Sequence, residues 1–202
     1  RGGVIDNFAV RGFLGTPDGG AEYYVDGFLA NRGMAPPRDP ATTERIEVLK
    51  GPAGALFGDV DPGGRVNIVT KAPRFTPHAN ASISYGSFDT RRIEVDATGP
   101  LSDTLAGRIV VAAEDSEGWR DHVTINRRIV SPSLTWQPSD AVRLTYIGEF
   151  SRFDTPFDRG IPANGGDANA LPRSNWYGEP SNGLTRSRND QHEFTGLAQL
   201  GD

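Results

Sequence analysis

Between residues 74 and 202, several runs alternate apolar and polar side chains with a period of two, the spacing that places successive side chains on opposite faces of a β-strand. In the run from Arg143 to Phe150, Leu144 and Tyr146 fall on one face and Glu149 on the other. Six such runs predict strands: Ser82–Gly86, Arg92–Thr98, Leu105–Glu114, Val130–Trp136, Arg143–Phe150 and Glu193–Leu200.

Residues 1–73 show a different pattern, in which short β runs are separated by glycine-rich turns. The runs predicted here are Phe8–Gly12, Glu22–Asp26, Glu44–Leu49 and Arg65–Lys71. Glycines supply backbone freedom at the bends between them. The sequence therefore predicts two domains, a compact one over residues 1–73 and a strand-rich one over residues 74–202.

The connections between the predicted strands differ greatly in length. Residues 99–103 and 137–140 are tight turns, whereas the link from about residue 154 to residue 190 is long and rich in Gly, Pro, Asn and Arg. Short turns at one end and long loops at the other are typical of outer-membrane barrels. Periodicity alone fits a soluble β-sandwich equally well, but a loop of this length is unusual in a compact sandwich.

Composition narrows the possible classes of protein. Hydrophobic residues make up 36% of the chain and mean hydropathy is -0.46, so the sequence has no apolar run long enough for a membrane-spanning helix. Barrel strands are not excluded by this test, because their two faces average to a polar value. The chain has no cysteine, which excludes disulfides and thiolate metal sites. Its net charge of -5, without a basic cluster, argues against nucleic acid as a partner.

Specific motifs lie in the first region. The stretch ERIEVLKGPAGALFG at residues 44–58, followed by PGGRVNIVTK at residues 62–71, closely resembles the plug signature of TonB-dependent outer-membrane receptors. The sequences RGF at residues 11–13 and YVDG at residues 24–27 resemble two further plug landmarks, in the right order. Together they are most similar to the ferric-siderophore branch of the family. Residues 134–138 and 141–144 resemble an early barrel strand, a periplasmic turn and the next strand.

The resemblance implies a fold and a function. The expected fold is a mixed α+β plug domain, of which residues 1–73 are the C-terminal part, followed by antiparallel strands of a large transmembrane β-barrel, with about 6 of 22 strands in residues 74–202. The expected function is TonB-dependent uptake of a ferric siderophore across the bacterial outer membrane. Expected partners are the ferric siderophore, outer-membrane lipid and the TonB complex, the last through an N-terminal segment outside this sequence. Iron arrives as a chelate, so no cofactor is expected.

The chain shows no signal peptide and stops within a strand-like pattern, so we expect it to belong to a longer precursor. Three alternatives remain open: a receptor of the same fold for cobalamin or an oligosaccharide, a secreted β-sandwich adhesin, and a glycosidase-like enzyme. The last is disfavoured because no convincing carboxylate pair or nucleophile motif is present. The glycine-rich stretch lacks the order of a phosphate-binding loop, and the three histidines lack metal-ligand spacing. We therefore expect neither an enzyme nor a metal site.

Candidate ligand residues follow from the resemblance. Arg11 matches the arginine that faces the bound chelate in siderophore receptors, and its alternative role is an ion pair within the plug. Aromatic residues in predicted extracellular loops could stack on a siderophore, or could form the interfacial girdle, the role expected for Trp136. The ligand candidates are Arg11, Asn31, Arg32, Arg38, Trp119, Trp176 and Tyr177.

A second group of residues carries the plug signature and is expected to be structural. Its charged members would hold the plug to lumen-facing charges of the barrel, since buried charges must be paired. The signature residues are Arg45, Glu47, Lys50, Gly51, Pro52, Gly58, Pro62, Gly63, Gly64 and Asn67. The candidate partners on the barrel wall are Arg92, Glu94, Asp96, Arg108, Glu114 and Glu149.

Overall fold

The computed structural model describes residues 23–31, 38–50, 64–158, 160–162, 165–167 and 171–199. Almost all of the regular structure in these residues is β-strand. The chain divides between Lys71 and Ala72 into two units, and each is described by itself. Among the described residues, no helix is long and apolar enough to cross a membrane.

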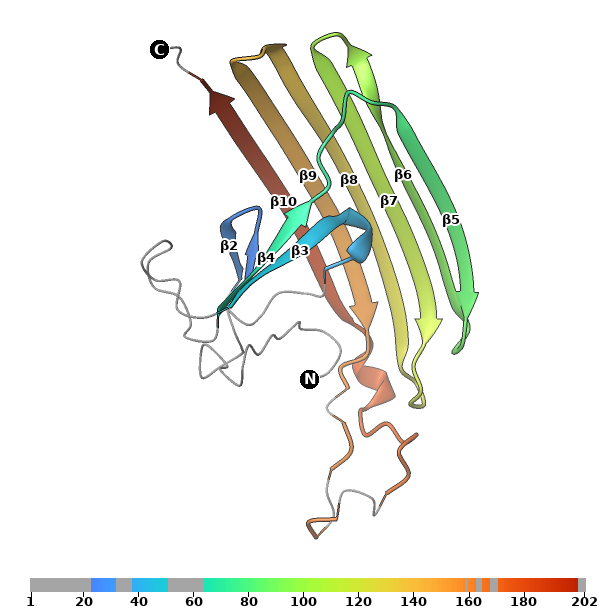
Figure 1. The fold of residues 1–202 in the computed structure, drawn as a ribbon. Coiled ribbons are helices and arrows are strands. Elements are labelled where there is room, and N and C mark those ends of the chain that lie inside the picture. Colours follow the sequence, from blue (N-terminus) through green and yellow to red (C-terminus); the bar gives the residue numbers. More distant parts are fainter. Residues whose placement is uncertain are drawn as a thin grey trace. The chain divides into compact units, whose positions relative to one another are not determined.

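The first unit contains a four-stranded sheet with the order β2-β1-β4-β3 (Figure 1). β1 runs parallel to β4, and the other neighbours are antiparallel. Its core side chains include Val25, Val66 and Ile68, all less than 10% exposed. The elements are β1 (Tyr23–Val25), β2 (Phe28–Asn31), the 3-10 helix η1 (Pro40–Thr42), β3 (Thr43–Lys50) and β4 (Gly64–Thr70).

The turn between β1 and β2 explains the YVDG motif. Asp26 and Gly27 both have positive φ, 49° and 87°, the conformation that a tight two-residue hairpin requires and that Asp-Gly adopts readily. The Asp26 carboxylate also accepts hydrogen bonds from the backbone N–H of Thr70, at 2.9 Å, and from its hydroxyl, at 2.5 Å. The turn is therefore fixed to the end of β4.

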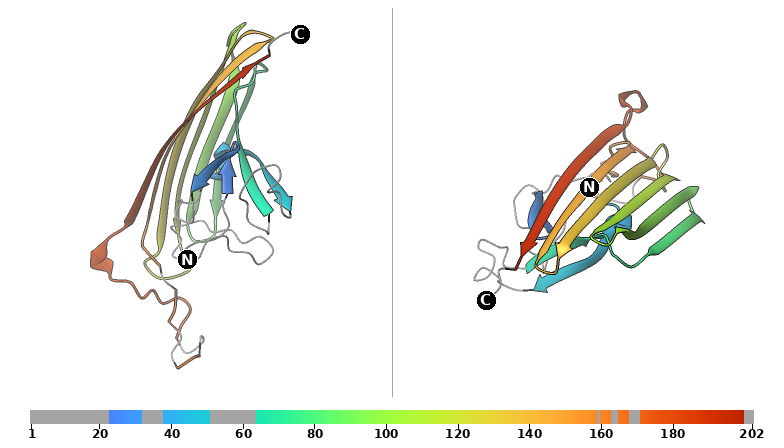
Figure 2. Two further views of the ribbon diagram at one scale, coloured as in Figure 1. Left: turned by 90° about the vertical axis from the view of Figure 1, so that its left-hand side faces the viewer. Right: turned by 90° about the horizontal axis from the view of Figure 1, so that it is seen from above.

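The second unit is a six-stranded antiparallel sheet in which each strand pairs with its neighbours in sequence, in the order β10-β9-β8-β7-β6-β5. The two views in Figure 2 show that these strands are long and twist together. Within the described residues the sheet is open, with β5 and β10 at its edges. The strands are β5 (His78–Gly86), β6 (Thr90–Ser102), β7 (Leu105–Glu117), β8 (Thr124–Ser139), β9 (Val142–Thr155) and β10 (Thr185–Ala198).

The alternation predicted from the sequence produces two distinct faces of this sheet. One face, called the polar face, carries buried Asp96, Arg108 and Ser133. The other, called the apolar face, exposes large side chains such as Ile93, Leu134 and Trp136, between 45% and 47% accessible. An apolar face of this kind suits contact with lipid hydrocarbon.

Several strands are longer than the sequence pattern predicts. β8 begins at Thr124 and not at Val130, and β10 begins at Thr185 and not at Glu193. The long link therefore covers residues 156–184, shorter than predicted. The prediction of these boundaries was wrong because the polar residues that precede each apolar run resemble a loop, whereas they continue the backbone ladder with the neighbouring strand.

The ends of the sheet differ as predicted. The β6–β7 and β8–β9 connections are tight turns at one end, at residues 103–104 and 140–141. The bounds predicted for them, 99–103 and 137–140, were wrong because β6 continues to Ser102 and β8 to Ser139. At the opposite end, called the long-loop end, lie the β5–β6 turn, the loop of residues 118–123 and the link of residues 156–184 (Figure 1).

Candidate functional site

Two loops at the long-loop end are fastened together. Arg120, between β7 and β8, forms an ion pair with Asp158, just after β9. The backbone N–H of Asp121 donates to the carbonyl of Ser174 at 2.8 Å. The ring of His122 lies 5.8 Å from that of Trp176. An ion pair, a backbone hydrogen bond and a ring contact thus hold the two loops together.

The link after β9 encloses a hollow of about 450 Å³ whose lining includes Phe157, Trp176, Tyr177 and Glu179. The indole N–H of Trp176 is buried and has no hydrogen-bond partner among the described residues. Tyr177 is 47% exposed, and its hydroxyl accepts a hydrogen bond from the Asn175 side chain at 3.0 Å. The hollow therefore offers aromatic surfaces, which suit a ligand with a planar group.

The structure brings together part of the predicted ligand set. Trp176 and Tyr177 line the hollow, and Trp119 lies on the adjoining loop with the Arg120 guanidinium 4.4 Å from its ring centroid. Asn31 is the last residue of β2, and Arg38 is half-buried just before η1. Arg11 and Arg32 lie outside the described residues, so their ligand roles remain predictions.

Sequence reasoning missed Arg120, Asp158, Phe157 and Glu179. Arg120 directly follows Trp119, and an arginine beside a loop aromatic residue is a usable signal for a binding loop. Asp158 carried no such signal, because 38 residues separate it from Arg120 in the chain. Only the pairing of β8 with β9 brings their loops together.

In the first unit, the plug-signature residues form a chain of hydrogen bonds across the sheet. The Asn67 side chain accepts from the backbone N–H of Gly27 at 3.0 Å and donates to Glu47 at 2.9 Å. Glu47 also accepts from the Arg45 guanidinium at 2.8 Å. The hydrogen bond from Asn67, and then that from Arg45, hold the pKa of the Glu47 carboxyl below its usual value.

Arg65 also fixes the hairpin turn, although the sequence did not single it out. Its guanidinium donates to the carbonyl of Gly27 at 3.0 Å and lies 3.3 Å from the centroid of the Tyr24 ring.

Lys50 and Gly64 are paired at the end of the β3–β4 ladder. The other signature residues, Gly51, Pro52, Gly58, Pro62 and Gly63, lie outside the described residues.

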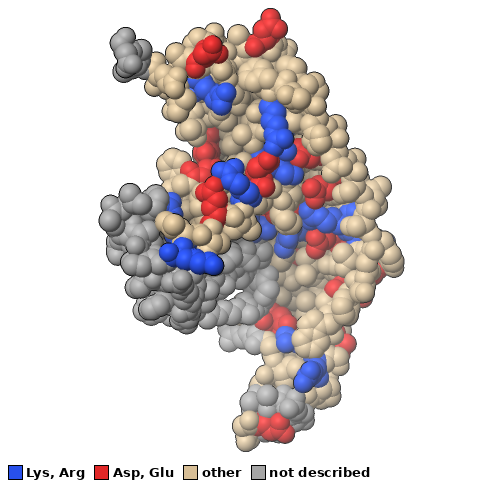
Figure 3. Space-filling model, in the orientation of Figure 1, with Lys and Arg blue, Asp and Glu red and all other residues tan. Residues whose placement is uncertain are grey.

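The polar face of the six-stranded sheet carries paired charges. Arg108 binds Asp96 through two hydrogen bonds of 2.8 and 2.7 Å, and both side chains are at most 6% exposed. Arg92 lies 3.0 Å from Glu114 and 3.1 Å from Glu94. Figure 3 shows acidic and basic side chains interspersed along the sheet, not separated by sign. Ion pairs from Arg45, Glu47 or Lys50 to this wall remain a prediction.

Arg108 also secures the segment that enters β5. It donates to the carbonyl of Ala72 at 2.9 Å, and the Thr98 hydroxyl accepts from the backbone N–H of Arg74, also at 2.9 Å. The first residues after the division between the units are therefore attached to β6 and β7.

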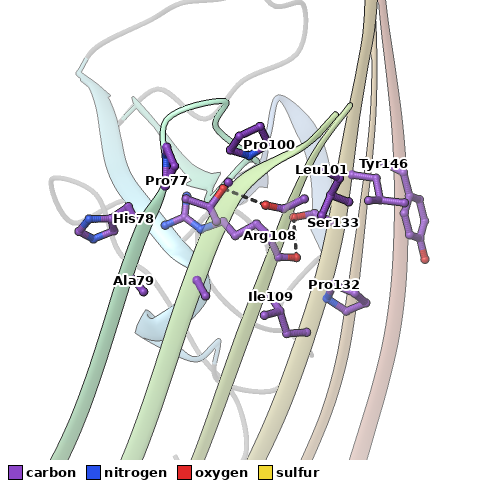
Figure 4. A pocket seen from close by; sticks show the side chains of 15 residues that line it. Pro77, His78, Ala79, Pro100, Leu101, Arg108, Ile109, Pro132, Ser133 and Tyr146 are labelled. Carbon is purple, nitrogen blue, oxygen red and sulfur yellow. Dashed lines mark hydrogen bonds between the residues drawn. The ribbon is translucent and has the colours of Figure 1, made fainter. Parts of the chain in front are cut away.

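A second hollow, of about 710 Å³, lies at the tight-turn half of the same sheet (Figure 4). Many of its lining side chains, including Ala97, Ile109, Leu134 and Tyr146, belong to the apolar face. Its surroundings suit hydrocarbon better than a polar chelate, so the hollow at the long-loop end is the stronger ligand candidate. Within the described residues, no group of three or more His, Asp or Glu side chains could hold a metal ion.

A small sheet carrying the plug motifs, followed by long antiparallel strands with one apolar face, is typical of receptors of the bacterial outer membrane. Residues 1–65 match the family described as the TonB-dependent Receptor Plug Domain. The chain belongs to the TonB-dependent receptors, which are outer-membrane proteins and not enzymes.

Curated relatives agree with this assignment. The chain is 41% identical over 168 residues to the metal-pseudopaline receptor CntO of Pseudomonas aeruginosa, a match that covers 82% of this chain and 24% of CntO. It is 34% identical over 180 residues to the catecholate siderophore receptor Fiu of Escherichia coli, covering 86% of this chain and 22% of Fiu. The chain thus spans about a quarter of the length of these relatives.

Solved structures show the same fold. The siderophore receptor PiuA from Acinetobacter baumannii superposes with a TM-score of 0.82 at 21% identity, over 98% of this chain and 30% of PiuA. The open form of Fiu from Escherichia coli gives a TM-score of 0.67 at 33% identity, over 74% of this chain and 23% of Fiu.

Proposed function

We propose that the receptor containing this chain imports a metal chelate, specifically a ferric siderophore, across the outer membrane. The observation that carries the proposal is the pair of fastened loops at the long-loop end, whose hollow presents Trp176 and Tyr177. Support comes from relatives named as receptors for catecholate siderophores, ferrioxamine and metal-pseudopaline. Planar chelating groups match the aromatic rings.

In this proposal the protein is a passive gate. The chelate binds to the extracellular loops and to the outward side of the plug, where we place Arg11, Asn31, Arg32 and Arg38. TonB then acts through an N-terminal segment and remodels the plug inside a barrel of 22 strands. Glu47 and Asn67 of the signature, together with Arg65, keep the plug sheet ordered until that point, because they link the β1–β2 turn, β3 and β4 by side-chain hydrogen bonds.

A second candidate ligand is a pseudopaline chelate of another metal. The 41% identity to the metal-pseudopaline receptor favours it. The two ligands differ in their donor groups and in their metal, so binding assays with each metal-loaded chelate distinguish them. Binding of cobalamin or an oligosaccharide, but of neither chelate class, would contradict both candidates.

The test uses the intact receptor in detergent, with chelate affinity measured by quenching of tryptophan fluorescence. The probes are a ferric catecholate, ferrioxamine B and metal-loaded pseudopaline. We expect Trp176→Ala to raise the dissociation constant about three- to tenfold, since aromatic contacts contribute about 0.5–1.5 kcal/mol each. Arg11→Ala is expected to raise it roughly tenfold to a hundredfold, because a charge-assisted hydrogen bond contributes about 1.5–3 kcal/mol.

Trp136→Ala is the matched control. It removes the same side chain from the apolar face, far along β8 from the long-loop end, and should leave affinity unchanged. Arg45→Ala should loosen the plug and raise passive entry of small antibiotics, with a smaller effect on binding. If Trp176→Ala and Arg11→Ala both bind every chelate as the unaltered receptor does, the proposed site is wrong.

A further inference from the structure

The hollow at the long-loop end combines aromatic side chains with a single carboxylate. Phe157 and Tyr177 line it and keep 43% and 47% of their surface accessible. Glu179 lines the same hollow, two residues after Tyr177 in the chain. Of the described residues that line it, Glu179 alone carries a charge. Aromatic rings and carboxylates are the groups with which proteins bind organic cations.

The Glu179 side chain is held in place through only one of its two oxygens. Its Oε1 accepts from the backbone N–H of Ser181 at 3.3 Å and from the Ser181 hydroxyl at 3.1 Å. These bonds fix the carboxylate to the 3-10 helix η2 (Pro180–Asn182). Its Oε2 has no hydrogen-bond donor within the described part of the chain. The carboxylate is therefore positioned by the backbone and still has an oxygen available to a ligand.

No described arginine pairs with this carboxylate. Arg120, on the adjoining loop, is paired with Asp158. Arg186 follows Thr185, which lines the hollow, and alternation along β10 directs the two side chains to opposite faces of the sheet. The whole link after β9 contains three carboxylates and two arginines, and so has a net negative charge. The hollow therefore favours a positively charged group over an anion.

We propose that this hollow selects ferric chelates that carry an ammonium group, and that Glu179 and Tyr177 bind the ammonium. The inference rests on the proposed function, because it names the class of chelate that the same site accepts. An ammonium has three N–H donors and no acceptor, so it can donate to Oε2 of Glu179. Its charge is attracted to the electron-rich face of the Tyr177 ring. An anionic chelate would instead bring like charge toward Glu179.

The test compares two chelates that differ only in this group, ferrioxamine B and its N-acetylated form. Both hold iron through three hydroxamates, and only the first carries a terminal ammonium. Their affinities for the intact receptor in detergent are measured by fluorescence quenching. We expect ferrioxamine B to bind roughly tenfold more tightly than the acetylated form, the effect of one charge-assisted hydrogen bond.

Glu179→Gln should remove this preference by weakening the binding of the ammonium-bearing chelate alone. The glutamine carbonyl can still accept from Ser181, so the turn is kept while the charge is lost. Tyr177→Leu should reduce the preference about two- to fivefold, the effect of one exposed cation–π contact, whereas Tyr177→Phe should keep it. Glu117→Gln is the matched control. It makes the same replacement at the end of β7, outside the lining of the hollow, and should retain the full preference.

Two results would overturn the ammonium site and leave chelate import standing. One is equal affinity of the unaltered receptor for the two hydroxamate chelates, and the other is a preference that survives Glu179→Gln. Binding of an anionic ferric catecholate, with no binding of either hydroxamate chelate, would also overturn it. If no ferric chelate binds to the receptor, the proposed function itself is wrong.

Discussion

Gly64 shows why individual residues of the plug signature matter. Its φ is 131°, which only glycine adopts without strain, and a Cβ atom built on it would lie 2.3 Å from the carbonyl oxygen of Leu49. At this point the backbones of β3 and β4 lie so close together that only glycine, which has no Cβ atom, fits between them. Gly64, the second glycine of the Pro-Gly-Gly sequence, is required by this close approach and not by a phosphate or another ligand.

We predict that Gly64→Ala opens the β3–β4 ladder. The methyl group meets backbone atoms that cannot move aside without breaking the ladder, and a strained backbone adds a cost on the order of 1–3 kcal/mol. Hydrogen exchange of the β3 and β4 amides in the intact receptor should become faster. Gly86→Ala is the control, because its Cβ would meet only the Thr90 side chain at an ordinary 3.7 Å. Equal exchange rates in both variants would contradict this account.

At the scale of elements, the segment between the two units is attached to the first barrel strands. Arg108 on β7 joins Asp96 on β6 to the carbonyl of Ala72. This ion pair is buried, so each partner depends on the other to offset the loss of water. Any remodelling of the plug would leave residues 72–74 fixed to the barrel wall while this pair holds.

We predict that Asp96→Asn destabilises the receptor by about 3–5 kcal/mol, the usual cost of leaving one buried charge without its partner. Urea unfolding, followed by the heat-dependent shift of the barrel on gels, measures the change. The paired replacement Asp96→Leu with Arg108→Met should restore much of the loss, because no buried charge remains. Asp89→Asn, which alters an exposed pair with Arg91, should have little effect. A loss for Asp96→Asn no larger than that for Asp89→Asn would refute the anchoring role.

At the scale of the whole molecule, the two units differ in how far they bury their apolar side chains. The small sheet buries an apolar core of its own, including Val25 and Ile68. The six-stranded sheet instead exposes an apolar face and two unpaired edges, β5 and β10, within the described residues. Exposed edges and apolar patches promote association in water.

We predict that this 202-residue chain, expressed alone, does not form a stable monomer in water. It should aggregate, or stay dispersed only in detergent, because nothing covers the apolar face and the edge strands. Sedimentation and circular dichroism in buffer without detergent provide the measurement. A soluble monomer with a sharp cooperative melt would contradict the barrel assignment and would favour the soluble sandwich that periodicity alone allows.

The sequence by itself determined the two kinds of region and the two faces of the strands. Alternation with a period of two is a local property, so it assigned Leu144 and Tyr146 to one face and Glu149 to the other without any knowledge of neighbouring strands. The plug motifs were equally readable, because their glycines and the Asp-Gly turn follow from local backbone conformation. The resemblance to TonB-dependent receptors rested on these motifs and is confirmed.

Only the tertiary structure decided which charges meet. Asp96 binds Arg108, and Arg120 binds Asp158, because strand register brings together residues far apart in the chain. The same register extends β10 through Arg186 and Arg188, a stretch whose polarity resembles a loop. Local pattern records which face a side chain takes, whereas its partner is set by pairing between strands, and that pairing is a property of the folded sheet.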